Sequence, residues 1–223
     1  MFITVCGQKG GVAKTCTSIH LASIWHSQGK KVCVIDADKN RSALAYGIRG
    51  NLNFPIFPVS SAAKASRDSD IVITDGQASS DEEELKHLAY GSDLVIIPTT
   101  AKARSVELTV ELANLLSSLK VNHAALIVKV DFRQQKAAFQ AKHALEKFGL
   151  HVFEGFIPLL SAFDKAEASG KSVFDAKDDL GRSDPRRMTG WSAYCSIASQ
   201  ISCLISKHSS NNNKSNQILP ISA

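Results

Sequence analysis

The stretch that most restricts how this chain can fold is GQKGGVAKT, residues 7–15. It follows a short apolar run, FITVC, and precedes a run of helical character, CTSIHLASIWHSQG. A glycine-rich turn between a first strand and a helix presents backbone N–H groups at the helix N-terminus, where they favour a phosphate group. The stretch therefore predicts an α/β domain with a phosphate site after its first strand.

This loop departs from the general phosphate-binding pattern, G-x-x-x-x-G-K-[ST]. Counted back from Lys14, the two glycine positions hold Gln8 and Ala13. A methyl group at Ala13 is tolerated if its backbone is helical. In the part of the pattern that remains, Lys14 would contact the β- and γ-phosphates of a bound nucleotide, and the hydroxyl of Thr15 would bind Mg²⁺.

Alternating apolar runs and amphipathic stretches follow the loop. Continuous apolar strands joined through helices predict a doubly wound, mostly parallel sheet with helices on both faces. The predicted strands are Phe2–Cys6, Lys31–Ile35, Ile71–Thr74, Asp93–Ile97, Ala124–Val130 and Val152–Ile157. The predicted helices are Lys14–His26, Arg41–Tyr46, Asp81–Ala89, Ser105–Leu119, Gln134–Phe148 and Met188–Ser206. One domain, residues 1–208, precedes a polar tail, 209–223, that is predicted to be disordered.

Five segments together resemble the ParA/MinD family of ATPases. Lys-Gly-Gly-x-x-Lys-Thr, Lys9 through Thr15, is similar to the family's deviant Walker A motif. The other four segments resemble switch I, the Walker B strand with switch II, the next strand, and the late strand with its nucleotide loop. They are VCVIDADKNRSA (32–43), SDIVITDGQA (69–78), SDLVIIPTTAKARS (92–105) and FIPLLSAFDKAEASGKSVFD (156–175). The short form resembles the small plasmid-partition proteins and the related ATPase that distributes carboxysomes.

The resemblance implies a role for each lysine of the loop. In the family, two ATP-bound subunits pair face to face, and the first lysine, here Lys9, contacts the phosphates bound by the other subunit. The second, Lys14, serves its own ATP. A triphosphate with Mg²⁺ keeps excess negative charge, so an extra cation is valuable in a low-dielectric interface. Asp38 is the third catalytic residue that the resemblance implies, because it would position or activate the attacking water.

The resemblance also implies the remaining ligands of Mg-ATP. The residues around the nucleotide would be Gly10, Gly11, Val12, Ala13, Lys14, Thr15, Cys16 and Pro158, and those around the metal would be Thr15, Asp36, Asp38 and Asp75. Asp75 ends an apolar run and would hold Mg²⁺ through water as the Walker B acid. Lys39 stands where the family normally has proline, which predicts a looser switch I.

Non-specific double-stranded DNA is the predicted second partner, because short family members bind DNA through basic surface residues. The candidates taken forward are Arg182, Arg186, Arg187, Lys171 and Lys207. Their segment, 164–208, has a net charge of only +1, so an ordinary solvated surface stays an alternative. A ParB-like or McdB-like adaptor would stimulate slow ATP hydrolysis, and the protein would be cytoplasmic and associated with the nucleoid.

Three other interpretations remain open. A MinD-like membrane protein would need a basic amphipathic C-terminal helix, which the ending does not suggest, so no membrane partner is expected. A ligase similar to dethiobiotin synthetase would share length and fold but lack a lysine of the Lys9 type. A catalytically inactive relative would not need Lys14, Thr15, Asp38 and Asp75, all of which are present.

Overall fold

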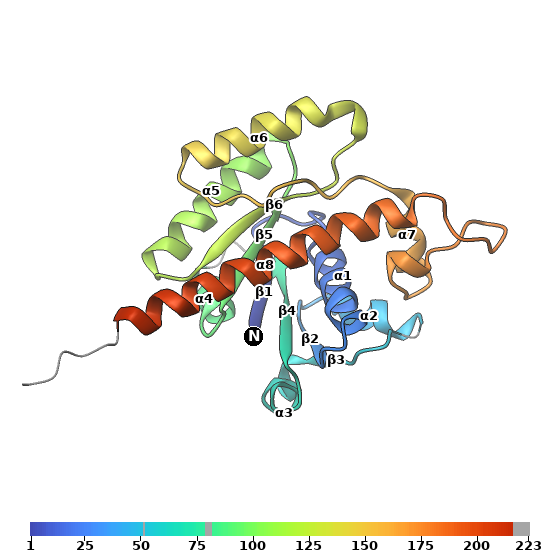
Figure 1. Ribbon diagram of the computed structural model, residues 1–223, viewed down its shortest axis with the longest axis horizontal. Coiled ribbons are helices and arrows are strands. Elements are labelled where there is room, and N and C mark those ends of the chain that lie inside the picture. Colours follow the sequence, from blue (N-terminus) through green and yellow to red (C-terminus); the bar gives the residue numbers. More distant parts are fainter. Residues whose placement is uncertain (51, 79–81, 216–223) are drawn as a thin grey trace, which may run out of the picture.

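The computed structural model describes residues 1–50, 52–78 and 82–215. Their centre is a six-stranded sheet in the order β3-β2-β4-β1-β5-β6 (Figure 1). Every pairing in it is parallel, which confirms the predicted fold class. The strands are β1 Phe2–Gly7, β2 Val32–Ala37, β3 Ile56–Pro58, β4 Ile71–Ala78, β5 Leu94–Thr99 and β6 His123–Ile127.

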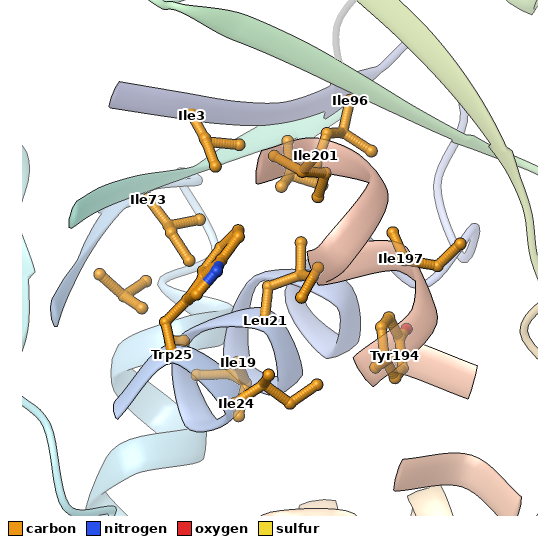
Figure 2. Packing of buried hydrophobic residues seen from close by; sticks show 14 of the residues in the cluster. Ile3, Ile19, Leu21, Ile24, Trp25, Ile73, Ile96, Tyr194, Ile197 and Ile201 are labelled. Carbon is orange, nitrogen blue, oxygen red and sulfur yellow. The ribbon is translucent and has the colours of Figure 1, made fainter. Parts of the chain in front are cut away.

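Helices cover both faces of the sheet, and each face has its own core. The helices are α1 Lys14–Ser27, α2 Ser42–Ile48, α3 Ala62–Arg67, α4 Glu82–Ala89, α5 Ala103–Ser118, α6 Gln135–Lys147, α7 Ser161–Ala168 and α8 Arg187–Ser215. On one face, α1 and α8 pack on the strands through residues such as Leu21, Trp25, Ile197 and Ile201 (Figure 2). The opposite face is covered by α4, α5 and α6. Burial on both faces explains why the strands read as unbroken apolar runs.

Two glycines end helices as their positions in the sequence suggest. Gly29 follows α1 with φ of 81° and Gly149 follows α6 with φ of 79°. In each case the next residue returns a hydrogen bond to the last turn, from Lys30 N–H to the Trp25 carbonyl and from Leu150 N–H to the Leu145 carbonyl. This left-handed ending is available to glycine without a steric penalty.

The prediction of a strand at Val152–Ile157 is wrong. The segment runs beside β6 and makes single bridges, Ala125 to Val152 and Val130 to Pro158. Gly155, with φ of 83°, turns the backbone out of the extended conformation between them. The short elements β3 and α3 were not predicted, since three and six residues are too few to show a period.

The ends of several other elements differ from expectation. The strand β4 continues to Ala78, past the predicted end at Thr74, and β6 ends at Ile127, before the predicted end at Val130. The helix α8 continues to Ser215, into the segment expected to be disordered, and residues 216–223 lie outside the described ones. Asp81, the expected first residue of α4, also lies outside them. All six strands point the same way, so the loops after β1, β2 and β4 meet at one edge of the sheet.

Candidate nucleotide site

The loop between β1 and α1 contains two left-handed residues. Gly11 has φ of 74° and Ala13 has φ of 59° with ψ of 34°. A helical backbone is expected at Ala13 from the sequence, and the backbone there is helical but left-handed. A left-handed conformation costs a non-glycine residue about 1 kcal/mol, so Ala13 stores strain directly before Lys14. Side chains added at Gly10 or Gly11 would meet no other atom within 4 Å, which leaves the backbone of the loop open.

A cavity of about 390 Å³ lies beside this loop. Of the predicted site residues, it is lined by Gly10, Gly11, Ala13, Lys14, Thr15, Cys16, Asp38 and Pro158. Val12 is not among them, because its side chain is buried on the other side of the loop, toward α5. Asp36 and Asp75 also do not line the cavity. The structure therefore brings the loop, switch I and the late proline around one hollow, although they are far apart in the sequence.

Lys14 is the buried cation of the cavity. Its side chain lies over the loop, and its Nζ donates to the backbone carbonyl of Lys9 at 3.1 Å. Only 8% of the residue is exposed. Burial lowers the pKa of the Lys14 ammonium, and the nearby carboxylates of Asp75 and Asp38 oppose this shift. A desolvated ammonium held by a backbone carbonyl can take up a polyanion favourably.

Asp75 lies under the start of α1 and has no exposed surface. The hydroxyl of Thr15 donates to its Oδ2 at 2.7 Å, and the hydroxyl of Ser18 donates to its Oδ1 at 2.9 Å. Burial raises the pKa of Asp75 to about 7, while these two hydrogen bonds lower it in part. A hydroxyl and a carboxylate joined in this way are hard oxygen donors of the kind that Mg²⁺ prefers.

Asp36 and Asp38 differ in their surroundings although they lie two residues apart. Asp36 is buried, and its carboxylate accepts the backbone N–H groups of Asp38 at 3.0 Å and Leu44 at 2.8 Å. Asp38 lines the cavity and accepts the N–H of Asn40 at 2.9 Å in a local turn. Asp36 thus anchors the segment that leads into α2, while Asp38 is presented to the hollow.

Lys9 points away from Lys14. Its Nζ donates to the hydroxyl of Ser105, on α5, at 2.9 Å, and Ser105 also bonds Thr100 at 2.8 Å. Lys9 does not line the nucleotide cavity. The side chains of the two lysines therefore lie on opposite sides of the loop, Lys14 in the nucleotide cavity and Lys9 against α5.

Some residues of the cavity were not anticipated from the sequence. Lys129 lines it from the segment just after β6 in a left-handed conformation, with φ of 56°. Tyr46, Gln77, Phe163, Glu167 and Tyr194 also line it. A lysine that interrupts the apolar run AALIVKV is the signal that could have identified Lys129. The aromatic residues carry no such signal, since their spacing matches that of core residues.

The side chains of the three arginines predicted to contact DNA have different neighbours and do not point the same way. Arg182 is paired with Asp178 at 2.9 Å. Arg186 lies over the ring of Phe132, with 5.9 Å from its Cζ to the ring centroid, and Arg187 lies over Phe174, at 5.6 Å. Arg187 also lines a hollow of about 460 Å³, together with Lys171 and Lys177. Lys207 lies on α8.

Comparisons with known proteins place the chain in a family. Residues 3–173 match the family model described as CobQ/CobB/MinD/ParA nucleotide binding domain. This chain belongs to that family, as the loop and the four other segments predict. The search of curated proteins finds no match.

Solved structures share the fold at low sequence identity. The MinD cell division protein of Aquifex aeolicus has a TM-score of 0.71 at 16% identity, over 90% of this chain and 96% of that one. Apo McdA of Cyanthece has a TM-score of 0.67 at 17% identity, over 86% and 97%. A candidate plasmid partition protein of Borrelia burgdorferi B31, bound to AMPPNP, has a TM-score of 0.65 at 20% identity, over 88% and 97%. Within the described part of the chain, no helix combines the length and apolarity needed to cross a membrane.

Proposed function

We propose that this protein is an ATPase of the ParA type that pairs around two molecules of Mg-ATP and binds DNA without sequence preference. An adaptor attached to a cargo would stimulate its slow hydrolysis, which would release the subunits from DNA. The proposed cargo is a plasmid or another replicon, and the adaptor would be ParB-like. Carboxysome positioning with an McdB-like adaptor is the alternative within the same mechanism.

The opposed directions of the two loop lysines carry this proposal. Lys14 lies in the cavity of its own subunit, whereas Lys9 lies outside it, on the hydroxyl of Ser105. A lysine that bound only its own nucleotide would not need to leave this cavity. Its hydrogen bond to the hydroxyl of Ser105 is exchangeable, which suits a cation that is transferred to phosphates across an interface. Binding of nucleotide and dimerisation would then be linked.

The residues around the cavity fit ATP with Mg²⁺. The open loop backbone and Lys14 would hold the phosphates, and Thr15 with Asp75 would hold the metal ion. When bound, Mg²⁺ supplies charge neutralisation at the β- and γ-phosphates. Asp38 would orient the attacking water from switch I. The carboxylate of Asp36 accepts two backbone N–H groups, which supports a role in holding switch I in place. Its contribution to the metal site would come through the position that it gives to Asp38.

A ligase similar to dethiobiotin synthetase is the candidate from a different class. The family to which the chain belongs includes more than one kind of protein by its description. The presence of Lys9 favours the partition type, because a ligase would have no use for a cation outside its own cavity. The two classes also differ in whether nucleotide binding changes the oligomeric state.

Substitution of each lysine tests the proposal. Lys14→Ala should abolish ATP binding, since the buried phosphate contact is lost, while Lys9→Ala should retain most of the binding and fail to dimerise. Light scattering with ATP and Mg²⁺ separates these results, and Ser105→Ala is a matched control that should still dimerise. A Lys9→Ala variant that dimerises like the wild type would sink the two-lysine assignment.

A further inference from the structure

A second hollow, of about 530 Å³, lies at the end of the sheet opposite the nucleotide cavity. It is formed where β2 and β3 begin, between the C-terminal end of α1 and the helix α3. Figure 1 shows α3 and the starts of these strands together at the lower edge of the molecule. None of its lining residues also lines the nucleotide cavity.

Much of the wall of this hollow is apolar. Phe54 and Pro55 line it from the segment that enters β3, Phe57 lines it from β3 itself, and Val32 and Ala65 line it from β2 and α3. The ring of His26 stands against that of Phe54 at 6.3 Å between centroids. Pockets of 300–1,000 Å³ with such walls are the usual size for small organic ligands. The two phenyl rings and the proline favour a flat aromatic body.

The mouth of the hollow is positively charged. Lys30, Lys31 and Lys64 line it and are exposed, and no ion pair joins any of them to an acid among the described residues. Asp68 is the acidic residue in the lining. The carboxylate of the neighbouring Asp70 accepts the backbone N–H of Lys31 at 2.9 Å, so it lies beside the hollow without lining it. Three ammonium groups against the carboxylates of Asp68 and Asp70 leave an excess positive charge beside an apolar wall.

We propose that this hollow, named here the basal pocket, binds a small aromatic carboxylate. The aromatic body would lie against Phe54 and Phe57, and the carboxylate would lie among Lys30, Lys31 and Lys64. A neutral aromatic molecule would form no ion pair with these three ammonium groups. A triphosphate would lack the backbone cradle that the loop at residues 7–15 provides at the other end of the sheet.

The basal pocket is connected to the segment that follows switch I. Phe54 and Pro55 lie between α2 and β3, and the carbonyl of Pro55 accepts the N–H of Val34, on β2, at 3.1 Å. Farther along the same strand stands Asp36, which anchors the start of α2. A ligand on Phe54 and Pro55 would therefore touch the connection that leaves α2.

Calorimetric titration with 1-naphthylacetate, in the absence of nucleotide, tests the proposal. The wild type should bind it saturably at one site and bind the neutral 1-naphthylacetamide at least several times more weakly. The double variant Lys30→Gln with Lys64→Gln should lose about tenfold in affinity for the carboxylate, which corresponds to about 1.4 kcal/mol from the two exposed ammonium groups together. Lys136→Gln, which removes an exposed lysine from α6, is the matched control and should bind like the wild type.

A filling variant locates the site. Ser61 lines the pocket, and Ser61→Trp should abolish binding of naphthylacetate while the affinity for an ATP analogue stays unchanged. If Ser61→Trp does not fold, as judged by its thermal unfolding, the lysine pair decides alone. The proposal is overturned by the absence of saturable binding to the wild type, by equal affinity for carboxylate and amide, or by full affinity in the folded Ser61→Trp variant. None of these results bears on ATP-driven dimerisation, so the proposed function is tested separately.

Discussion

Gly50 and Gly170 contact each other through their backbones, and neither has room for a side chain. A methyl group on Gly170 would lie 2.7 Å from the Tyr46 carbonyl oxygen and would also collide with the backbone N of Gly50. The same two segments are joined by the hydroxyl of Tyr46, which donates to the carbonyl of Lys171 at 2.7 Å. These contacts hold α2, which follows switch I, against the turn after α7. Because Tyr46 and Glu167 both line the nucleotide cavity, this contact shapes one of its walls.

Substitution of Gly170 by alanine should therefore weaken both the fold and nucleotide binding. Gly155→Ala is a matched control, because Gly155 also has a positive φ but has open space around it. We expect Gly170→Ala to lower the free energy of unfolding by about 2 kcal/mol more than Gly155→Ala, since backbone clashes add to the conformational strain. Its affinity for a fluorescent ATP analogue should fall severalfold. Urea unfolding and fluorescence titration measure these effects, and equal losses in the two variants would contradict the prediction.

Asp38→Ala should trap an ATP-bound dimer. The contacts of the loop with the phosphates would survive, while water activation would be lost, so turnover should fall by about 10²–10⁴-fold with nucleotide retained. Asp38→Asn is the informative companion, because an amide oxygen can still accept the N–H of Asn40 and preserve the turn. Phosphate release and retained nucleotide would be assayed together. Normal turnover in Asp38→Asn would show that the carboxylate has only a positional role.

DNA binding should depend on ATP and on Lys171, Lys177 and Arg187 more than on Arg182 and Arg186. The first three line one hollow, whereas Arg182 is paired with Asp178 and Arg186 is turned toward Phe132. Phosphate contacts give a salt-dependent affinity without sequence preference, and pairing of two subunits multiplies them.

Glutamate substitutions distinguish the two sets of basic residues. We expect the Lys171, Lys177 and Arg187 triple variant to flatten the salt dependence of DNA affinity, and the Arg182 and Arg186 double variant to change it less. Salt titrations with ATP and with ADP supply the comparison. Equal DNA affinity in the two nucleotides would remove nucleotide-gated DNA binding from the mechanism.

His20 makes the stability of the fold sensitive to mild acid. The backbone N–H of Val173 donates to its Nε2 at 2.9 Å, so its Nδ1 carries the proton and donates to the carbonyl of Cys16 at 2.7 Å. The ring stacks on Tyr194, with 5.2 Å between centroids. Burial lowers the pKa of His20 to about 4, against the effect of the hydrogen bond to Cys16. The folded protein therefore holds the neutral imidazole.

A pKa below the unfolded value of about 6.5 means that the unfolded chain binds the proton more tightly. The stabilisation by His20 is complete above pH 6.5 and is lost as the pH falls toward 4. At pH 5 the loss should be about 2 kcal/mol relative to neutral pH. His20→Gln cannot titrate in this range, so its unfolding free energy in urea should fall less between pH 7 and pH 5. Parallel losses in wild type and variant would assign the effect to other groups.

Several features of this protein follow from short-range sequence alone. The loop at residues 7–15, the apolar runs of β1, β2, β4 and β5, and the helices α1, α2 and α4 are encoded by residue types and spacings within a few positions. Parallel strands necessarily place Lys14, Asp38 and Asp75 at one edge of the sheet. The class of fold was therefore predictable, and the family match agrees with it. The region of the nucleotide site follows from the same residues and stays a prediction.

Other features were decided only by the tertiary structure. The direction of Lys9 depends on Ser105, the buried anchoring of Asp36 depends on Leu44, and the wall near Tyr46 depends on Gly50 meeting Gly170. The basic residues 182, 186 and 187 lie close together in the sequence, yet different aromatic and acidic neighbours turn them apart. Each of these outcomes depends on which atoms the packed chain brings into contact. Residue spacing cannot specify those contacts, because the direction of a side chain is selected by the neighbours available to it.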